Sequence, residues 1–280
     1  MTLELRMIEK DGCTIHYWIT PEHRGPWLIF MHGAGADHRM FDEQLQALDD
    51  RYGVLLWDAR GHGQFRPIGA DFSIQLLVED MLAIMNREGI ERASFIGQSM
   101  GGNTAQEIAF YHPDRVESLI LIDCTCNTMK LSFMEKQLIS LTPLLLSMYP
   151  WKTMVEQSAR ASSVKPNVRE YLRECFHLVG AADFKRIFLA TTACLHEEVG
   201  YRIQRPFLLV CGVHDQTGNI RKNSPLWAER EPACEFHWID HAGHCANQDH
   251  PEAFNQLMIS FLDHHSPVTA KPIWKERNSL

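Results

Sequence analysis

The pentapeptide GQSMG at residues 97–101 constrains this chain more than any other feature of its sequence. An apolar run at residues 93–96 comes before it, and a helix-like stretch begins near Gly102. GxSxG between a strand and a helix is typical of a nucleophile elbow, a tight turn that exposes the hydroxyl of its serine. The glycines two residues before and after the serine let the strand and the helix approach each other closely. The sequence therefore predicts that Ser99 is a nucleophile.

Short apolar runs recur along the chain with helix-like segments between them. This pattern is typical of a parallel sheet covered by helices on both faces, and near-continuous hydrophobicity fits strands that are buried on both sides. The five inner runs occupy residues 27–31, 54–57, 94–96, 119–122 and 207–210. By contrast, residues 3–8 and 13–19 mix polar and apolar side chains around the turn at residues 11–12, which predicts an antiparallel pair at a sheet edge. We therefore expect an α/β fold with a mostly parallel central sheet.

Two helices can be recognised from their sequence patterns. Apolar residues at positions 74, 77, 81 and 84 recur at spacings of three and four, so they form one face of an amphipathic helix that should lie on the sheet. Residues 251–262 predict a closing helix with proline in its first turn.

The length of 280 residues allows one large core with an inserted subdomain. Helix-like segments follow one another over residues 126–205 without a clear strand, which predicts an inserted helical cap. We expect the core to comprise residues 1–125 and 206–266, and residues 267–280 to form a loose polar tail. Because the cap is rich in apolar side chains, we expect a small-molecule substrate that is partly hydrophobic.

Charge and cysteine content exclude several classes of function. The net charge is −8 and the acidic residues are scattered, so the sequence contains no basic stripe that would bind nucleic acid. The first twelve residues lack the apolar segment of a signal peptide, and no apolar run is long enough to span a membrane. Eight cysteines without a CxxC pair fit reduced thiols in a core. We expect a cytoplasmic protein without a membrane partner, and the sequence leaves its oligomeric state open.

A serine nucleophile needs a general base within hydrogen-bond reach and an acid that orients the base. In an elbow of this architecture the histidine comes last in the chain, in a loop after the final strand. Residues 235–239 predict that strand, and the histidines at positions 241 and 244 follow it. We predict that His244 is the base, with His241 as the competitor, because His241 lies closer to the strand end and would point less easily toward Ser99.

The orienting acid should lie just past the carboxyl end of a strand, where the active groups of open α/β sheets gather. Asp215 satisfies this condition after the strand at residues 207–210, and we predict that it is the acid. Asp123, at the end of the preceding strand, is the alternative acid. A second interpretation is that its carboxylate accepts hydrogen bonds from the connection between that strand and the inserted helical segment, and so caps this connection.

An oxyanion requires N–H donors that are already in place. We predict the backbone N–H of Met100, at the start of a helix, and that of Ala34, in the small-residue loop at residues 32–37. The spacing of His241, His244 and His250 resembles a metal site only superficially, because glycine and proline indicate a loop there. No metal and no cofactor are expected.

Five motifs occur in one order: HG at residues 32–33, DARGHG at 58–63, GQSMGG at 97–102, Gly212 with Asp215, and GH at 243–244. In this order they resemble the α/β-hydrolase superfamily over roughly residues 20–262. The resemblance implies a Ser-His-Asp triad at Ser99, His244 and Asp215, with a helical cap inserted after the sixth strand. The turn at residues 60–63 is similar to a family loop with a mainly structural role, so we leave its histidine out of the site.

These predictions together indicate a cofactor-free serine hydrolase of an ester-like bond, which can be a carboxylic ester, a lactone or a thioester. Relatives that open epoxides or displace halide carry aspartate at the elbow, so Ser99 argues against both activities. Two alternatives stay open. Carbon-carbon bond hydrolases resemble residues 99–102 but commonly have asparagine in place of Gln98, and ligand-sensing proteins can retain the triad.

Overall fold

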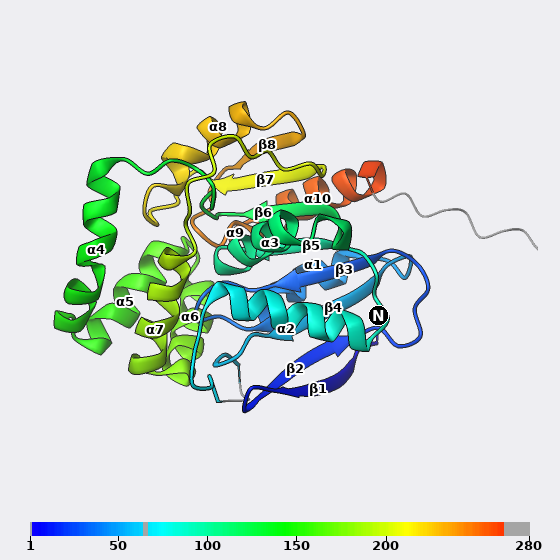
Figure 1. Cartoon of the computed structure of the whole chain (residues 1–280), viewed down its shortest axis with the longest axis horizontal. Coiled ribbons are helices and arrows are strands. Elements are labelled where there is room, and N and C mark those ends of the chain that lie inside the picture. Colours follow the sequence, from blue (N-terminus) through cyan, green and yellow to red (C-terminus); the bar gives the residue numbers. More distant parts are fainter. Residues whose placement is uncertain (1, 64–66, 266–280) are drawn as a thin grey trace, which may run out of the picture.

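The computed structural model describes residues 2–63 and 67–265, so the tail predicted at residues 267–280 lies outside the described residues. A single eight-stranded sheet runs through the molecule in the order β1-β2-β4-β3-β5-β6-β7-β8 (Figure 1). Its strands are β1 (Glu4–Lys10), β2 (Cys13–Ile19), β3 (Trp27–Met31), β4 (Gly53–Asp58), β5 (Ala93–Gln98), β6 (Val116–Ile122), β7 (Phe207–Gly212) and β8 (Cys234–Ile239).

The sheet is mostly parallel, which confirms the predicted α/β class. β1 pairs with β2 and β2 with β4 in antiparallel fashion, whereas the pairs from β3 to β8 are parallel. The predicted antiparallel edge pair is therefore confirmed. Every residue of β4, β5 and β7 is buried, as expected for strands covered on both faces, while the edge strand β8 exposes half of its side chains.

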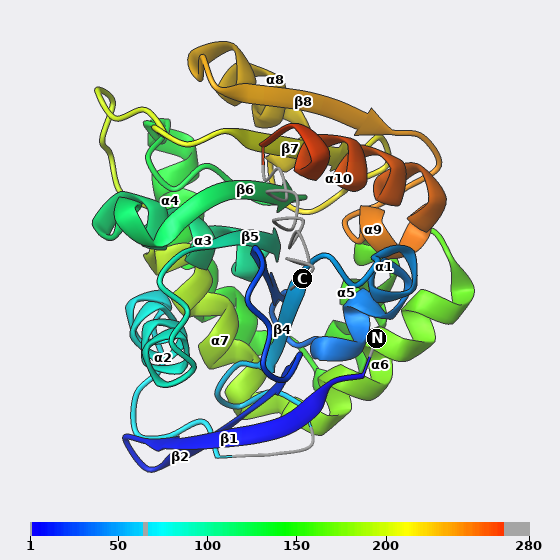
Figure 2. The same cartoon turned by 90° about the vertical axis from the view of Figure 1, so that its right-hand side faces the viewer.

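Helices cover both faces of the sheet, with α2 and α3 on one side and α1 and α10 on the other (Figure 2). Outside the segment between β6 and β7, the helices are η1 (His38–Phe41), α1 (Asp42–Ala47), α2 (Ile74–Arg87), α3 (Met100–Tyr111), η2 (Pro113–Arg115), α8 (Ile220–Arg230), α9 (Ala246–Asp249) and α10 (Pro251–His265). The predicted apolar face of α2 is confirmed, because all four of its residues are buried. Ser73 caps the N-terminus of α2, because its hydroxyl accepts the backbone N–H of Leu76 at 3.1 Å.

The loop after β4 is fastened to α2 by a buried ion pair. Arg60 donates from Nε and Nη2 to the two carboxylate oxygens of Asp80 at 2.7 and 2.6 Å. Both side chains are almost fully buried, and the next charged groups are more distant: Lys10 lies 3.5 Å from Asp80, and Asp11 lies 3.8 Å from Arg60. Removal of either partner would leave a buried charge with only this more distant counter-ion and would destabilise the fold. The paired geometry of a guanidinium and a carboxylate therefore fixes this loop at one end of the sheet.

Four helices separate β6 from β7 and gather beyond one end of the sheet (Figure 1). They are α4 (Phe133–Met148), α5 (Trp151–Ser162), α6 (Pro166–Val179) and α7 (Ala181–Ala193). α6 buries five side chains at helical spacing. α4 differs from the others because none of its residues is buried, although Ser132 and Glu135 form a complete capping box at its start.

Two further properties bear on the predictions from sequence. All eight cysteines are free thiols. Within residues 2–63 and 67–265, the helices are too short or too polar to cross a lipid bilayer.

Candidate active site

Ser99 occupies a strained turn between β5 and α3. Its backbone has φ 49° and ψ −115°, a conformation that costs a residue other than glycine roughly 1–3 kcal/mol. The neighbouring elements approach so closely that a Cβ atom on Gly101 would lie 1.9 Å from the carbonyl oxygen of Met31 in β3. A Cβ atom on Gly97 would lie 2.5 Å from the carbonyl oxygen of Gly101. Glycine at both positions is therefore a steric requirement of the turn.

His244 lies in the loop between β8 and α9 and contacts both of the other predicted residues. Its Nε2 is 3.0 Å from the Oγ of Ser99, and its Nδ1 is 3.0 Å from a carboxylate oxygen of Asp215, which follows β7. An ionised carboxylate only accepts hydrogen bonds, so Nδ1–H is the donor to Asp215 and the neutral ring keeps Nε2 as an acceptor for the serine hydroxyl. The structure thus brings Ser99, His244 and Asp215 into one hydrogen-bonded row.

Two opposing effects act on the pKa of His244. Burial lowers the pKa of the ring, but the charge and hydrogen bond of Asp215 outweigh burial and raise the pKa above its ordinary value. Asp215 therefore stabilises positive charge on the imidazole.

Asp123, the alternative acid, is also buried but has other partners. Its Oδ1 accepts the backbone N–H of Gly212 at 2.7 Å, and its Oδ2 accepts the backbone N–H of Ala246 at 3.0 Å. The carboxylate therefore does not cap the connection after β6, as the second interpretation suggested. It binds one N–H at the end of β7 and one at the start of α9. Burial, together with the charge of Asp215, raises the pKa of Asp123 to about 7.

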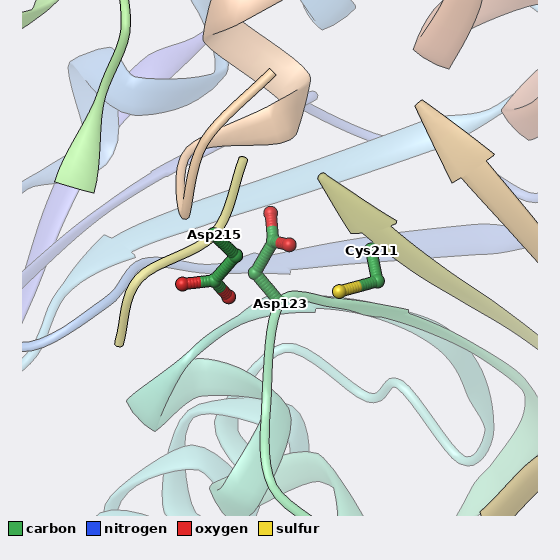
Figure 3. A group of neighbouring side chains, drawn as sticks. All are labelled: Asp123, Cys211 and Asp215. Carbon is green, nitrogen blue, oxygen red and sulfur yellow. The ribbon is translucent and has the colours of Figure 1, made fainter. Parts of the chain in front are cut away.

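Asp123, Asp215 and Cys211 bring three ligand-type atoms within 4.8 Å of one another (Figure 3). The carboxylate oxygens are already engaged: Asp215 accepts the backbone N–H of Thr217 at 2.7 Å as well as the histidine, and Asp123 accepts two backbone N–H groups. Burial also raises the pKa of the Cys211 thiol, so the sulfur keeps its proton. A cation would have to displace these donors, and this donor set fits a hydrogen-bond cluster better than a metal centre.

The two other histidines of the predicted loop lie apart from this row. His241 is exposed in a turn with φ 58°, and the Nδ1 of His250 accepts the backbone N–H of Ala253 at 3.3 Å. Within the described part of the chain, neither joins His244 in a group of side chains that could hold a metal ion.

The two predicted oxyanion donors flank the elbow. Met100 is the first residue of α3, where backbone N–H groups lack partners within the helix. Ala34 follows β3 and lines the same cavity as Ser99 and His244. Its loop is braced by His32, whose Nε2 accepts the N–H of Ala59 at 3.0 Å and whose Nδ1–H donates to the carbonyl of Gly33 at 2.8 Å.

Two residues with a part in this geometry were missed from sequence. The side-chain amide of Gln98 donates to the carbonyl oxygen of His244 at 2.6 Å, and the carboxylate of Asp249 accepts the N–H of Gly243 at 2.7 Å. Both fix the loop that carries the histidine. For Gln98, the sequence does contain a signal, which is a polar amide side chain at the end of a buried strand. For Asp249 it contains none, because the hydrogen bond to Gly243 depends on the conformation of a loop that sequence patterns do not describe.

A cavity of about 330 Å³ opens onto Ser99 and His244. Its apolar wall comes largely from α6 and α7, with Leu172, Phe176 and Phe184 among its members. Several serine and threonine residues also line the cavity. The size is within the range of sites for small molecules, about 300–1,000 Å³.

Comparison with known proteins shows the family and the fold of the chain. A family model described as alpha/beta hydrolase fold matches residues 26–251. A protein of Pseudomonas savastanoi pv. phaseolicola that carries the provisional name carbamate hydrolase RutD is 25% identical over 250 residues, covering 85% of this chain and 94% of the relative. The 3-oxoadipate enol-lactonase 2 of Acinetobacter baylyi is 27% identical over 256 residues, covering 85% and 88%. In fold, the chain is similar to a thermophilic esterase from Thermogutta terrifontis, with a TM-score of 0.77, 20% identity and coverage of 94% of this chain and 99% of the esterase.

Proposed function

The chain belongs to the α/β-hydrolase family, and on that premise we propose that it is a serine hydrolase that cleaves an ester-like bond with Ser99, His244 and Asp215. The observation that carries the proposal is the position of the His244 ring, 3.0 Å from Ser99 on one side and 3.0 Å from Asp215 on the other. A nucleophile, a base and a group that orients the base are the three parts that acyl transfer to serine requires.

In the first half of the reaction, Nε2 of His244 takes the hydroxyl proton as the Oγ of Ser99 attacks the substrate carbonyl. Asp215 holds the ring in the required tautomer and stabilises the imidazolium that forms. The N–H groups of Met100 and Ala34 are proposed to stabilise the oxyanion of the tetrahedral intermediate, a contribution of about 3–4 kcal/mol for one such donor.

In the second half, His244 gives its proton to the leaving group and an acyl-enzyme remains on Ser99. The same ring then deprotonates a water molecule, which attacks the acyl carbonyl. As the bond between the acyl carbon and the Oγ of Ser99 breaks, His244 returns this proton to Oγ and the acid is released. Apart from the substrate and this water molecule, every group in the sequence is supplied by the chain itself.

Among ester-like bonds, the names of the relatives favour a lactone as the first to be tested, since one relative is named an enol-lactonase. The relative named a carbamate hydrolase adds a carbamate to the bonds to be tested. We also propose that residues 126–205 act as a cap over the site. The support for this division is that Leu172, Phe176 and Phe184 come from this segment and line the cavity that contains Ser99.

The test compares Ser99→Ala with Ser158→Ala on p-nitrophenyl acetate and on a small lactone. Ser158 lines the same cavity but lies outside the hydrogen-bonded row, so it is the matched control. We expect Ser99→Ala to lower kcat by about 10⁴-fold or more and to abolish labelling by a fluorophosphonate, while Ser158→Ala keeps both. Unchanged turnover in folded Ser99→Ala protein would overturn the mechanism, and a single slow turnover by the unaltered chain would indicate a ligand sensor instead.

A further inference from the structure

A second cavity, of about 390 Å³, adjoins the cavity at Ser99. The two cavities share part of their walls, because six residues line both: Thr125, Phe188, Thr192, Leu195, Gly218 and Ile220. We call the second cavity the distal chamber and define it by the residues that do not also line the first cavity. The main apolar residues among them are Met129, Leu131, Ile139 and Trp227.

Helix α4 forms one wall of the distal chamber. The residues of α4 that face it include Glu135, Ile139 and Thr142, which recur at spacings of four and three and so share one face of the helix. These three side chains are partly covered, whereas most of the rest of α4 is exposed. α8 supplies the opposite wall through side chains that include Trp227, which is fully buried.

Three polar side chains in the wall of the distal chamber, those of Glu135, Thr142 and Ser224, are already bonded within the protein, while Lys130, which also lines the chamber, is exposed to solvent. Glu135 accepts the N–H of Ser132 at 2.7 Å and also binds the side-chain amide of Asn219. The hydroxyls of Thr142 and Ser224 donate to backbone carbonyls of their own helices at 2.9 Å. With these groups engaged, the chamber offers a ligand mainly apolar contact, which suits an uncharged aliphatic group.

We propose that the two cavities form one substrate site, in which the ester group reacts at Ser99 and an aliphatic chain attached to it fills the distal chamber. This inference rests on the proposed function and names its substrate class: esters or lactones that carry an extended, uncharged hydrocarbon chain. The chain passes the shared wall at Phe188 and Leu195 and ends between α4 and α8.

Burial of hydrocarbon predicts how the rate depends on chain length. Each methylene that leaves water contributes about 0.8 kcal/mol, which corresponds to about a fourfold gain in kcat/KM. A short acyl group such as acetyl stays in the cavity at Ser99 and gains nothing from the distal chamber. The gain should begin only once the chain is long enough to pass Leu195.

The experiment measures kcat/KM for two ester series, p-nitrophenyl esters from acetate to laurate and acetate esters of alcohols of the same lengths. We expect kcat/KM to rise in one of the series by about 10²-fold or more from the shortest member to its optimum. In Ile139→Trp, which fills the distal chamber, the rise should be lost while hydrolysis of the shortest ester stays unchanged. Met129→Trp, at a residue that lines the distal chamber and not the cavity at Ser99, should give the same result and serves if Ile139→Trp does not fold.

Leu144→Trp is the matched control, because Leu144 lies on the same helix, is 59% exposed and does not line the distal chamber. It should retain the full dependence on chain length. The proposal is overturned if both series are flat, or if Ile139→Trp and Met129→Trp fold and still respond to chain length as Leu144→Trp does. Failure of the proposed function looks different, since the shortest esters would then be hydrolysed no faster by the unaltered chain than by Ser99→Ala.

Discussion

The carboxylates of Asp123 and Asp215 lie within 4.8 Å of one another, past the ends of β6 and β7, yet they bind different partners. Asp215 accepts the hydrogen bond from the imidazole of His244. Asp123 accepts backbone N–H groups from Gly212 and Ala246, which lie three residues before Asp215 and two residues after His244. One buried carboxylate therefore ties together the two loops that carry the predicted acid and base.

Replacement of the carboxylate that touches the ring should disable the chemistry and spare the fold. In Asp215→Asn the side chain can no longer hold His244 in the tautomer that accepts the serine proton, and we expect kcat to fall by about 10⁴-fold. Steady-state kinetics with p-nitrophenyl acetate measure the loss, and circular dichroism checks the fold. A folded Asp215→Asn protein with kcat within tenfold of the unaltered chain, on the order of 1.4 kcal/mol, would contradict this role.

Asp123→Asn should act mainly on stability. The amide has one acceptor oxygen for two backbone donors, so one buried N–H loses its partner, at a cost of about 1–3 kcal/mol in the free energy of unfolding. Urea denaturation measures this cost, and kcat should fall far less than in Asp215→Asn. If Asp123→Asn abolished turnover and left the unfolding midpoint unchanged, Asp123 and not Asp215 would be the orienting acid.

The activity should fall in acid as His244 takes up a proton. The ring must be neutral to accept the proton of Ser99, and its pKa is raised above the ordinary value of 6.5 by Asp215. The acidic limb of kcat/KM against pH should therefore have a midpoint above 6.5, with activity present above it and lost below it. Asp123 also raises the pKa of His244, so Asp123→Asn should move this limb to lower pH, whereas Ser158→Ala should leave it in place.

Substitution of Gly101 should damage the elbow through sterics alone. A Cβ atom there would lie 1.9 Å from the Met31 carbonyl oxygen, so β3 and α3 must separate before Gly101→Ala can fold. We expect a loss of about 3 kcal/mol or more in the free energy of unfolding, together with loss of esterase activity. Gly200→Ala is the control, because nothing lies within 4 Å of the position of its Cβ atom. Equal unfolding midpoints for the two variants would show that the elbow tolerates a side chain.

The strands and the elbow could be predicted because their signals are local. Buried strands leave continuous apolar runs, and the face of α2 repeats at helical spacing, so both are visible in a short window of sequence. The order of motifs then placed Ser99, Asp215 and His244 on the loops after β5, β7 and β8, and the structure brings these three side chains into contact. Chain order was sufficient here because parallel strands end at the same edge of the sheet.

The supporting contacts could not be predicted, since they join residues far apart in sequence. Gln98 and His244 are separated by 146 positions, and Asp123 and Ala246 by 123. No periodicity or spacing relates such pairs. The walls of the cavities were equally hidden, because the apolar residues of α6 and α7 have the same sequence pattern whether they face a cavity or a core.

The absence of buried side chains on α4 has a consequence for how the molecule moves. A helix that buries little apolar surface loses little when it detaches, so its local opening requires much less free energy than unfolding of the sheet. Amide hydrogens of α4 should thus exchange with solvent through local opening, while those of β4, β5 and β7 exchange only when the whole core unfolds. The distal chamber is thus closed on one side by a helix without buried side chains, and local opening of α4 would give a long substrate a path of entry that does not disturb Ser99.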